Sequence, residues 1–488
     1  MNKPIRTLSV FCLLLFAALL VNATYLQYVD AGSLNAHSDN KRVRDAEFAR
    51  KRGAIVAGDT SVAESRKTSD QYVYQRYYKQ PRKYAQLTGF YSYIYGRSGV
   101  ESSENQILSG SDPRLFVNRV VDLVGNSQPK GGSVTLTIDP KAQTAAYDGL
   151  RALGENVTGA VVALQPSTGK VLAMVSSPTY DPNKLASHRF GDVSKAWSKL
   201  NADKLKPLLN RATQEVYPPG STFKLVTSAA ALSSGQYTPQ TIVKGGTSLD
   251  LPQTTTNLVN ENGSSCGGDR ITLTRALEVS CNVSYGSIGL KLGAAALRQQ
   301  AEKFGFDQTY LNDLPGQVAS RFPARPDPPQ TALSAIGQYD VAATPLQMAM
   351  VAAGIADGGT VMRPYVVDEI RAPDLSVLEK TDPEAYRSNA VSASVARQLT
   401  QMMVSVVDNG TGTTAHIPGI KVAGKTGTAQ SSPERPPYAW FVSFAPADDP
   451  KVAVAVLVED AGVERNAISG SGLAAPIAKR VMQAVIGR

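Results

Sequence analysis

The sequence predicts a mixed α+β fold in which one sheet is assembled from distant parts of the chain. Two short apolar runs flank a Gly-containing turn within residues 159–175, and a second such pair spans residues 438–459. The region between these two predicted hairpins is rich in helix-forming residues, and residues 473–486 have helical spacing. Strands at both ends of one region, with helices between them, indicate a sheet packed against helices.

The length of 488 residues allows two or three domains, at least one of them with a large core. A formal net charge of +9 is spread through the chain, and no basic helix or nucleic-acid module accompanies it. This distribution disfavours nucleic-acid binding and is compatible with an anionic membrane or wall polymer.

The N-terminus is expected to be a membrane anchor. Lys3 and Arg6 precede an apolar run at residues 8–21, and a further stretch with polar interruptions ends near Val29. A basic end before such a run places that end in the cytoplasm and the following chain outside. We expect residues 1–30 to form an uncleaved, single-pass anchor in the cell membrane with an extracytoplasmic body. Cleavage after Ala23 is the alternative.

The three cysteines divide between the anchor and the body of the protein. Cys12 lies in the anchor, so Cys266 and Cys281 are the thiols of the exported body. Two exported thiols favour one disulfide, which the chain-entropy model values at about 3 kcal/mol for so short a loop. Two unrelated buried thiols are the alternative.

Residues 31–130 are predicted to be a separate N-terminal domain. Residues 31–52 are polar and charged, with too little alternation for a strand, which is typical of a stalk. From residue 53 to about residue 126 the chain is rich in tyrosine, and Tyr-x-Tyr alternation predicts strands with one aromatic face. Stacking of these rings on bases or sugars is the less favoured interpretation. Residues 127–132 are expected to be a linker.

The second predicted domain runs from residue 131 to residue 488. Residues 134–138 alternate apolar residues with threonine as a strand does, and Asp139-Pro140 is a typical start of a helix. The two hairpins and the C-terminal helix described above complete its sheet and one of its helices.

The first of three chemical motifs in this domain is Ser221-Thr222-Phe223-Lys224. It follows a Pro-Pro-Gly turn and precedes an Ala- and Leu-rich segment, which places Ser221 at the start of a helix. Residues three apart share a helix face, so Lys224 can reach the Ser221 hydroxyl. That hydroxyl needs a base to become a nucleophile, and a lysine can serve if burial or a second cation such as Lys425 lowers its pKa.

A histidine base and a metal centre are both disfavoured. The three histidines, His37, His188 and His416, lie in no recognisable triad signature. Neither His-Glu-x-x-His nor a set of closely spaced metal ligands occurs, so we expect no metal and no cofactor.

The second motif, Ser280-Cys281-Asn282, places a hydroxyl and an amide within one turn. Ser280 can relay a proton to a leaving group, and Asn282 can hold a substrate backbone. Taken alone, such a motif is typical of a turn or a helix cap.

The third motif is Lys425-Thr426-Gly427-Thr428, at the expected entry of a strand. We expect Gly427 to let a substrate chain approach the strand edge and pair with it. The Lys425 ammonium and the hydroxyls of Thr426 and Thr428 suit a terminal carboxylate. Taken alone, this motif is typical of an exposed turn.

Together, and in this order, the three motifs resemble those of class B penicillin-binding proteins. Within that class the chain resembles the actinobacterial type called penicillin-binding protein A, and the resemblance covers nearly the whole chain. Four further segments support it: Arg52-Gly53-Ala54-Ile55, Gly99-Val100-Glu101, Leu209-Asn210-Arg211-Ala212 and Gly337-Gln338.

The resemblance implies D-alanyl-D-alanine transpeptidation on peptidoglycan stem peptides and covalent inhibition by β-lactams. It implies a penicillin-binding, serine β-lactamase-like fold for residues 131–488 and a non-catalytic dimerisation or pedestal domain for residues 31–130. Ser221 would attack the penultimate D-alanine carbonyl with Lys224 as base. The main-chain N–H groups of Ser221 and Thr428 would form the oxyanion hole.

The other motif residues take their roles from the same resemblance. Ser280 would pass a proton to the departing D-alanine and Asn282 would hold the donor peptide. The donor carboxylate would be bound by Lys425, Thr426 and Thr428.

Two features qualify the match to the family. Cys281 stands at the centre of the second motif, so a disulfide to Cys266 would tether the active-site loop itself. Glu278 lies four residues before Asn282, as in a β-lactamase deacylation motif, and we interpret this spacing as coincidence.

A partner is also implied, because the region before the catalytic domain is too small and too rich in tyrosine to hold a glycosyltransferase. The family points to a membrane-embedded glycan polymerase of the shape, elongation, division and sporulation group.

Two other functions would use the same fold. A serine β-lactamase shares the three motifs, but the anchor and the additional domain argue against it. A β-lactam sensor needs no transpeptidation, but no fused signalling domain is recognisable in this sequence.

Overall fold

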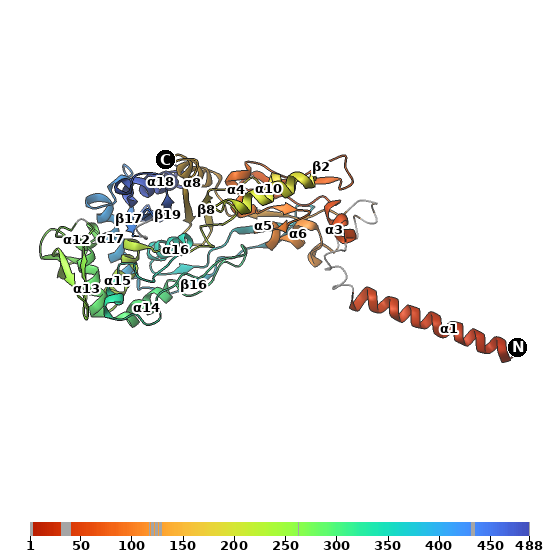
Figure 1. Cartoon of the computed structure of the whole chain (residues 1–488), viewed down its shortest axis with the longest axis horizontal. Helices are drawn as coiled ribbons and strands as arrows, with labels where there is room; N and C mark the ends of the chain where they lie inside the picture. The colour runs from red at the N-terminus through yellow and green to blue at the C-terminus, as the bar shows by residue number, and fades with distance from the viewer. Residues whose placement is uncertain are drawn as a thin grey trace.

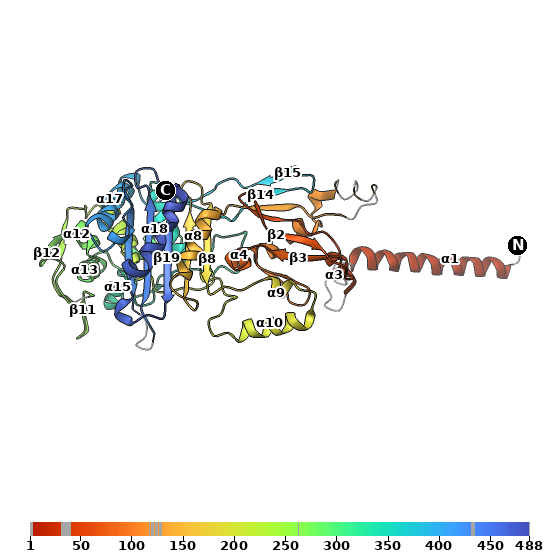
Figure 2. The same ribbon diagram turned by 90° about the horizontal axis from the view of Figure 1, so that it is seen from above.

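The computed structural model describes residues 3–487, apart from residues 31–40, 117, 119–121, 123–124, 126–128, 262 and 431–434. Two large β-sheets, each packed against helices, make up the body of the protein, and a single long helix extends from it (Figures 1 and 2). The mixed α+β class that the sequence predicts is confirmed.

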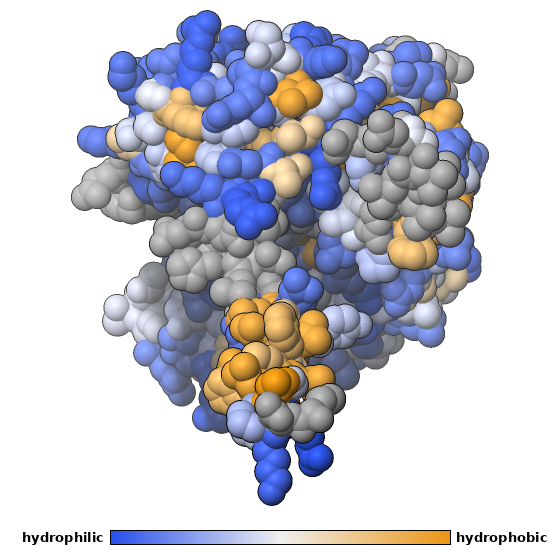
Figure 3. Space-filling view, turned by 90° about the vertical axis from the view of Figure 1, so that its right-hand side faces the viewer, coloured by the Kyte–Doolittle hydropathy of each residue, from blue (hydrophilic) through white to orange (hydrophobic). Residues whose placement is uncertain are grey.

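A long N-terminal helix covers the segment that the sequence predicts to be an anchor. α1 (Lys3–Thr24) continues into a π-helical turn, η1 (Tyr25–Val29), and none of the α1 residues is buried. This 27-residue segment is long and apolar enough to cross a membrane, by length and composition. Seen from the N-terminal side, it forms a hydrophobic cluster in front of a largely hydrophilic face (Figure 3).

The first large sheet has six strands in the order β15-β14-β6-β1-β2-β3. β1 pairs in parallel with β6, and β6 pairs antiparallel with β14. The strands are β1 (Ile55–Ala57), β2 (Thr60–Lys67), β3 (Tyr74–Tyr78), β6 (Ser133–Leu136), β14 (Val367–Arg371) and β15 (Val377–Lys380). β6, β14 and β15 lie beyond the predicted boundary at residue 130, so the C-terminal part of the chain completes the N-terminal sheet.

The expected stalk is wrong for residues 41–52, while residues 31–40 lie outside the described residues. α3 (Lys41–Phe48) is a helix, and Phe48 is only 6% exposed. The Phe48 ring stacks on Tyr91, with 4.4 Å between the ring centroids. Phe48 is the one aromatic residue of this charged segment, and one aromatic residue establishes no periodicity, so the sequence pattern does not reveal this packing.

The tyrosine-rich region forms strands, as Tyr-x-Tyr alternation predicts. Besides β3, it contains the short hairpin of β4 (Tyr91–Ser92) and β5 (Gly96–Arg97). Tyr72 and Tyr93 pack against Phe48 and Phe190 in one aromatic cluster. The rings in this cluster contact one another and stabilise the domain.

The described end of the predicted linker at residues 127–132 is held by backbone hydrogen bonds. Gly131 N donates to Lys51 O at 3.0 Å, and Gly132 N donates to Ile107 O at 2.9 Å. Residues 131 and 132 therefore belong to the packed N-terminal domain.

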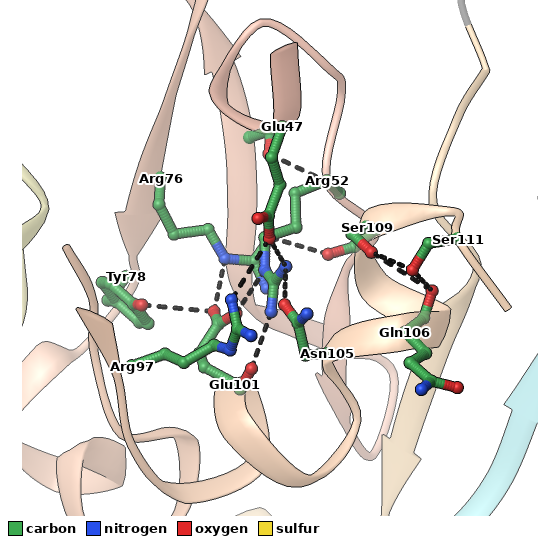
Figure 4. A network of polar contacts seen from close by, with 12 residues as sticks. Glu47, Arg52, Arg76, Tyr78, Arg97, Glu101, Asn105, Gln106, Ser109 and Ser111 are labelled. Atoms are coloured by element: carbon green, nitrogen blue, oxygen red, sulfur yellow. Dashed lines mark hydrogen bonds and ion pairs between the residues drawn. The ribbon is translucent and has the colours of Figure 1, made fainter. Parts of the chain in front are cut away.

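A buried charge network joins the strands and helices of this domain (Figure 4). The Glu101 side chain is fully buried, and its two oxygens accept from Arg52 Nε and Arg76 Nε at 2.5 Å each. Tyr78 Oη donates to the same carboxylate at 3.2 Å. Burial alone would raise the pKa of Glu101, but the charges of Arg76 and Arg52 hold it below its usual value.

The second large sheet has five antiparallel strands in the order β17-β18-β19-β7-β8. β7 (Thr158–Leu164) and β8 (Val171–Ser177) form the first predicted hairpin, and β18 (Tyr438–Ala445) and β19 (Val452–Asp460) form the second. β17 (Ala423–Ala429) carries the third motif and lies at the edge of the sheet. Both predicted hairpins are confirmed.

Helices cover both faces of this sheet. Successive side chains of a strand point to opposite faces, and the strands carry apolar side chains on both. Val161 and Val456 belong to the core shared with α8 (Pro140–Arg151) and α18 (Ala475–Ile486). Val162 and Leu457 belong to the core shared with α11 (Lys224–Ser233) and α16 (Pro345–Ala356). The helix starts predicted at Asp139-Pro140 and near Ser221 are present, as is the C-terminal helix.

A mostly helical lobe lies beside β17 at the end opposite the anchor (Figures 1 and 2). Its helices near the motifs are α12 (Leu273–Glu278), α13 (Asn282–Leu292) and α17 (Ala393–Asn409), and its small hairpins are β10 (Ser248–Asp250) with β11 (Asn257–Val259) and β9 (Ile242–Lys244) with β12 (Arg270–Thr272). The remaining helices and strands are α4 (Pro81–Thr88), α5 (Gly99–Ser103), α6 (Asn105–Ser109), α9 (Asn183–Ala186), α10 (Phe190–Ala202), α14 (Ala294–Lys303), α15 (Pro328–Ser334), β13 (Val361–Met362) and β16 (Ala385–Arg387).

Candidate active site

Ser221 lies in a tight 3-10 turn, η3 (Gly220–Phe223), that leads directly into α11. In a 3-10 turn, residues three apart lie one above the other, so Ser221 and Lys224 share a face. The turn is held in place by Gly220 N, which donates to Gly337 O at 3.0 Å, and by Trp440 Nε1, which donates to Pro218 O at 2.9 Å. The nucleophile therefore lies on a fixed turn rather than on a free loop.

The edge strand β17 packs closely against this turn. A Cβ added to Gly427 would lie 3.0 Å from Thr222 Cγ2 and 3.2 Å from Pro219 O, so residue 427 is glycine because the strand approaches the serine turn. The expectation that Gly427 also lets a substrate chain approach the strand edge stays a prediction. The outer edge of β17 is available for strand pairing, because β17 is the last strand of its sheet.

The second motif lies between α12 and α13, where Ser280 has a left-handed backbone with φ of 60°. Such a conformation costs about 1–3 kcal/mol for a residue with a side chain, and strain of this size is concentrated at functional sites. Cys281 N donates to Ala276 O at 2.8 Å and Lys224 Nζ donates to Ser280 O at 2.6 Å, which together hold the turn.

The three motifs meet around the Ser280 hydroxyl. Lys425 Nζ lies 2.9 Å and Lys224 Nζ lies 3.2 Å from Ser280 Oγ. Asn282 Oδ1 accepts from Lys224 at 2.8 Å, and Asn282 Nδ2 donates to Val259 O at 3.1 Å. Residues 56 and 145 positions apart in sequence thus place two amines, a hydroxyl and an amide in contact.

Both lysines are fully buried, and burial lowers their pKa values. The pKa of Lys224 is lowered well below its usual value by burial first and by the nearby charge of Lys425 second. Burial lowers the pKa of Lys425 to about 7. Burial and the charge of Lys425 therefore favour the neutral amine of Lys224, which is the form that can accept a proton.

The contacts of Lys224 leave one position for a hydroxyl proton. Its neutral amine has two N–H groups, and the oxygens of Ser280 O and Asn282 Oδ1 can only accept. In the neutral form the lone pair of the amine remains to accept from a hydroxyl, and Ser280 Oγ lies 3.2 Å from Lys224 Nζ. Among the hydrogen bonds of the described residues, none joins Lys224 Nζ to Ser221 Oγ, so proton transfer between them stays a prediction.

The two threonines of the third motif differ in position. Thr428 lines the cavity next to Ser221. Thr426 is only 7% exposed, and its hydroxyl lies 2.6 Å from Thr411 Oγ1 and 3.5 Å from Lys425 Nζ. Thr428 is thus the one in contact with the open space, and Thr426 contacts the loop after α17.

A cavity of about 720 Å³ opens over the nucleophile. Its wall includes Ser221, Asn282 and Thr428 from the motifs, and also Glu261, Tyr339 and Arg465. The last three belong to no motif and have no periodic signal, because long-range packing of separate loops brings them to the site. Sequence reasoning did not identify them.

Glu278 does not take part in this site. It pairs with Arg275 at 3.1 Å and accepts a hydrogen bond from Ser405, which lies on α17. Its backbone carbonyl accepts from Thr411 N at 3.0 Å. These contacts give Glu278 a role in joining α12 to α17 and support the interpretation that its spacing from Asn282 is coincidence.

A disulfide joins Cys266 to Cys281, in the middle of the second motif. Of the two interpretations of these thiols, the pairing is the one that the structure contains. Asn260, on the same wall of the cavity, accepts from Val283 N at 3.1 Å. The segment after β11 is therefore tied to the Ser280 turn both covalently and by hydrogen bonds.

We expect replacement of Cys266 with alanine to lower the free energy of unfolding by about 3 kcal/mol, because the 15-residue separation then no longer closes a loop in the unfolded chain. The left-handed Ser280 turn also loses its tether, so acylation of Ser221 by a β-lactam should slow. Urea denaturation and acylation kinetics measure both effects. Cys12→Ala, at the exposed thiol of α1, is the matched control. Equal stability of oxidised wild type and Cys266→Ala would contradict this expectation.

Two family models match the chain. The penicillin binding protein transpeptidase domain matches residues 159–483, and the penicillin binding protein A dimerisation domain matches residues 52–134.

Curated relatives match over the full length. The chain is 45% identical over 492 residues to the peptidoglycan D,D-transpeptidase PbpA of Mycolicibacterium smegmatis, covering 100% of this chain and 99% of that protein. It is 43% identical to the protein of the same name from Mycobacterium tuberculosis, with the same coverage.

Solved structures agree with these relatives. The ceftriaxone acyl-enzyme complex of penicillin-binding protein A from M. tuberculosis matches with a TM-score of 0.87 and 43% identity, covering 91% of this chain and 100% of that one. The penicillin G acyl-enzyme complex of the same protein matches with a TM-score of 0.84 and 42% identity, covering 90% and 100%.

Proposed function

Because this chain belongs to the penicillin-binding protein transpeptidase family, we propose that it is a peptidoglycan D,D-transpeptidase that works through an acyl-enzyme at Ser221. The observation that carries the assignment of Ser221 is the convergence of Lys224, Ser280 and Lys425 beside the serine turn. None of the relatives reported above supports the alternatives, a serine β-lactamase or a β-lactam sensor.

The reaction begins with the neutral amine of Lys224. It takes the proton of Ser221 Oγ as that oxygen attacks the carbonyl of the penultimate D-alanine. Ser280, hydrogen-bonded to both lysines, passes a proton to the nitrogen of the departing D-alanine. An amine of a neighbouring stem peptide then attacks the acyl-enzyme, forms the cross-link and returns the proton to Ser221.

Charge on the tetrahedral centre is stabilised by backbone dipoles. The main-chain N–H groups of Ser221 and Thr428 form the oxyanion hole in this proposal, and the start of α11 adds partial positive charge near the oxyanion. The closeness of β17 to the serine turn supports this pairing, since Gly427 and Gly220 allow the two backbones to approach.

The donor peptide binds along β17. Its terminal carboxylate is held by the Lys425 ammonium and the hydroxyls of Thr426 and Thr428, and Thr426 Oγ1 also lies 3.5 Å from Lys425 Nζ. The donor backbone pairs with the free edge of β17 as an added strand, and Asn282 contacts its side. β-Lactams carry a carboxylate and a reactive carbonyl in the same positions and acylate Ser221 covalently.

The domain organisation, cellular location and polymerase partner belong to the same proposal. Residues 1–30 anchor the protein in the cell membrane, residues 31–130 form a non-catalytic domain whose sheet is completed by β6, β14 and β15, and the rest of residues 131–488 forms the transpeptidase domain outside the cytoplasm. A membrane-embedded glycan polymerase of the shape, elongation, division and sporulation group supplies the strands. The apolar α1 and the family match of residues 52–134 support this arrangement.

We expect peptide mapping of the full-length protein, after treatment with a labelled penicillin, to find the label on the peptide that contains Ser221. The label should persist for hours, because a transpeptidase has no dedicated water-activating base for fast deacylation. A label on another residue would overturn the assignment of the nucleophile. Fast release with turnover would favour a β-lactamase.

A further inference from the structure

The wall of the catalytic cavity carries an acidic and a basic residue. In the described part of the chain, Glu261 and Arg465 are the only charged residues on its wall, because Lys224 and Lys425 are buried beneath it. Arg465 Nη1 donates to Arg435 O at 2.9 Å. Glu261 is exposed and follows β11, so a carboxylate faces solvent within the same cavity as Ser221, Asn282 and Thr428.

The backbone before Glu261 is fixed to the catalytic turn. Val259 O accepts from Asn282 Nδ2 at 3.1 Å, and Asn260 Oδ1 accepts from Val283 N at 3.1 Å. Asn260 Nδ2 also donates to Gly246 O at 2.9 Å and to Ser264 O at 2.8 Å. The backbone that leads to Glu261 is therefore held in register with Asn282, and Glu261 lies on the wall of the same cavity.

The charge of Glu261 reaches the reacting groups. Burial lowers the pKa values of Lys224 and Lys425, and the negative charge of Glu261 opposes that effect at both lysines. The acyl donor cannot be the molecule that this carboxylate attracts, because the donor itself ends in a carboxylate. The acyl acceptor has the opposite charge, since an aliphatic amine with a pKa of about 10.4 is an ammonium ion at neutral pH.

We propose that Glu261 is a specificity-determining residue that binds the ammonium group of the acyl acceptor at the mouth of the catalytic cavity. This inference rests on the proposed transpeptidase function. The bound ammonium first releases one proton to solvent. The neutral amine then bonds to the acyl carbon, the bond from that carbon to Ser221 Oγ breaks, and the second amine proton passes through Lys224 to Ser221 Oγ.

The test compares two acceptors on one acyl-enzyme. Full-length wild type and Glu261→Gln are acylated with a D-alanyl thioester donor at pH 7.5. The acyl group is then captured by a peptide with one aliphatic primary amine or by hydroxylamine, which is uncharged at this pH. Both acceptors react with the same acyl-enzyme. A change in the pKa of Lys224 or Lys425 therefore affects the two reactions equally and cancels in the ratio of their kcat/KM values.

We expect that ratio to fall about fivefold in Glu261→Gln, the effect of removing one charge about 4 Å away in a solvated site. Asp250→Asn, at the exposed end of β10 and outside the cavity, is the matched control and should keep the wild-type ratio. An unchanged ratio in Glu261→Gln, or an equal fall in Asp250→Asn, overturns the inference. Failure of wild type to form an amide with either acceptor overturns the proposed function instead, and this inference with it.

Discussion

Replacement of Lys224 with alanine is expected to slow β-lactam acylation of Ser221 by about 10²- to 10⁴-fold, the usual contribution of a positioned general base. The physical reason is the lowered pKa of the buried amine, which favours the neutral form of Lys224 that can take the serine proton. Stopped-flow measurement of acylation at a series of penicillin concentrations gives the rate constant directly.

The pH profile distinguishes a lost base from a damaged fold. In wild type, acylation should decline as the pH falls through the lowered pKa of Lys224, because the protonated amine cannot accept a proton. The alanine variant should lose this acidic limb. Lys421→Ala is the control, at an exposed lysine that pairs with Asp448 just before β17. This variant should keep both the acylation rate and its decline at acidic pH. An alanine variant at position 224 that acylates within tenfold of wild type would exclude this lysine as the base.

The second large effect is expected in the N-terminal domain. Glu101→Gln keeps the shape of the side chain but removes the counter-charge of the buried Arg76 and leaves the buried Arg52 with Glu47, at 3.7 Å. Breaking a buried ion pair on one side costs about 3–5 kcal/mol, so urea should unfold this variant at a clearly lower concentration. Because folded Glu101 has a lowered pKa, its contribution is present above the unfolded-state pKa of about 4.3 and is lost as the pH falls through the folded value.

Glu64→Gln is the matched control for this charge change. Glu64 pairs with Arg66 and Lys79 on the surface of the same sheet, where such pairs contribute about 0–1 kcal/mol. The acylation rate per folded molecule should be unchanged in both variants, because neither residue lines the catalytic cavity. Equal denaturation midpoints for Glu101→Gln and wild type would show that the buried carboxylate does not stabilise the fold.

Local sequence patterns predicted the parts of the fold that depend on local physics. The hairpins at residues 159–175 and 438–459 follow from apolar runs around turn residues, and the start of α8 follows from Asp139 as a side-chain cap. The position of Ser221 and Lys224 on one face follows from helical spacing alone. These features need only a few neighbouring residues to specify them.

Long-range packing produced the features that sequence reasoning missed. β14 joins β6 across more than two hundred residues, and no turn or periodicity in either segment indicates its partner. Gly427 is required by contact with Thr222, which lies on another segment, and Glu261 reaches the site through hydrogen bonds of Asn260. In each case the structural feature depends on a contact with a residue that is remote in sequence. Local patterns in one sequence do not predict such contacts.

The sharing of strands between the two halves of the molecule has a mechanical consequence. The chain leaves the six-stranded sheet after β6 to enter α8, returns from α16 into β14, and leaves again after β15 toward α17, which packs on β17. Several covalent crossings resist bending about a single hinge. The two sheets are therefore expected to respond to an applied force as one stiff body, which keeps Ser221 at a fixed distance from the six-stranded sheet.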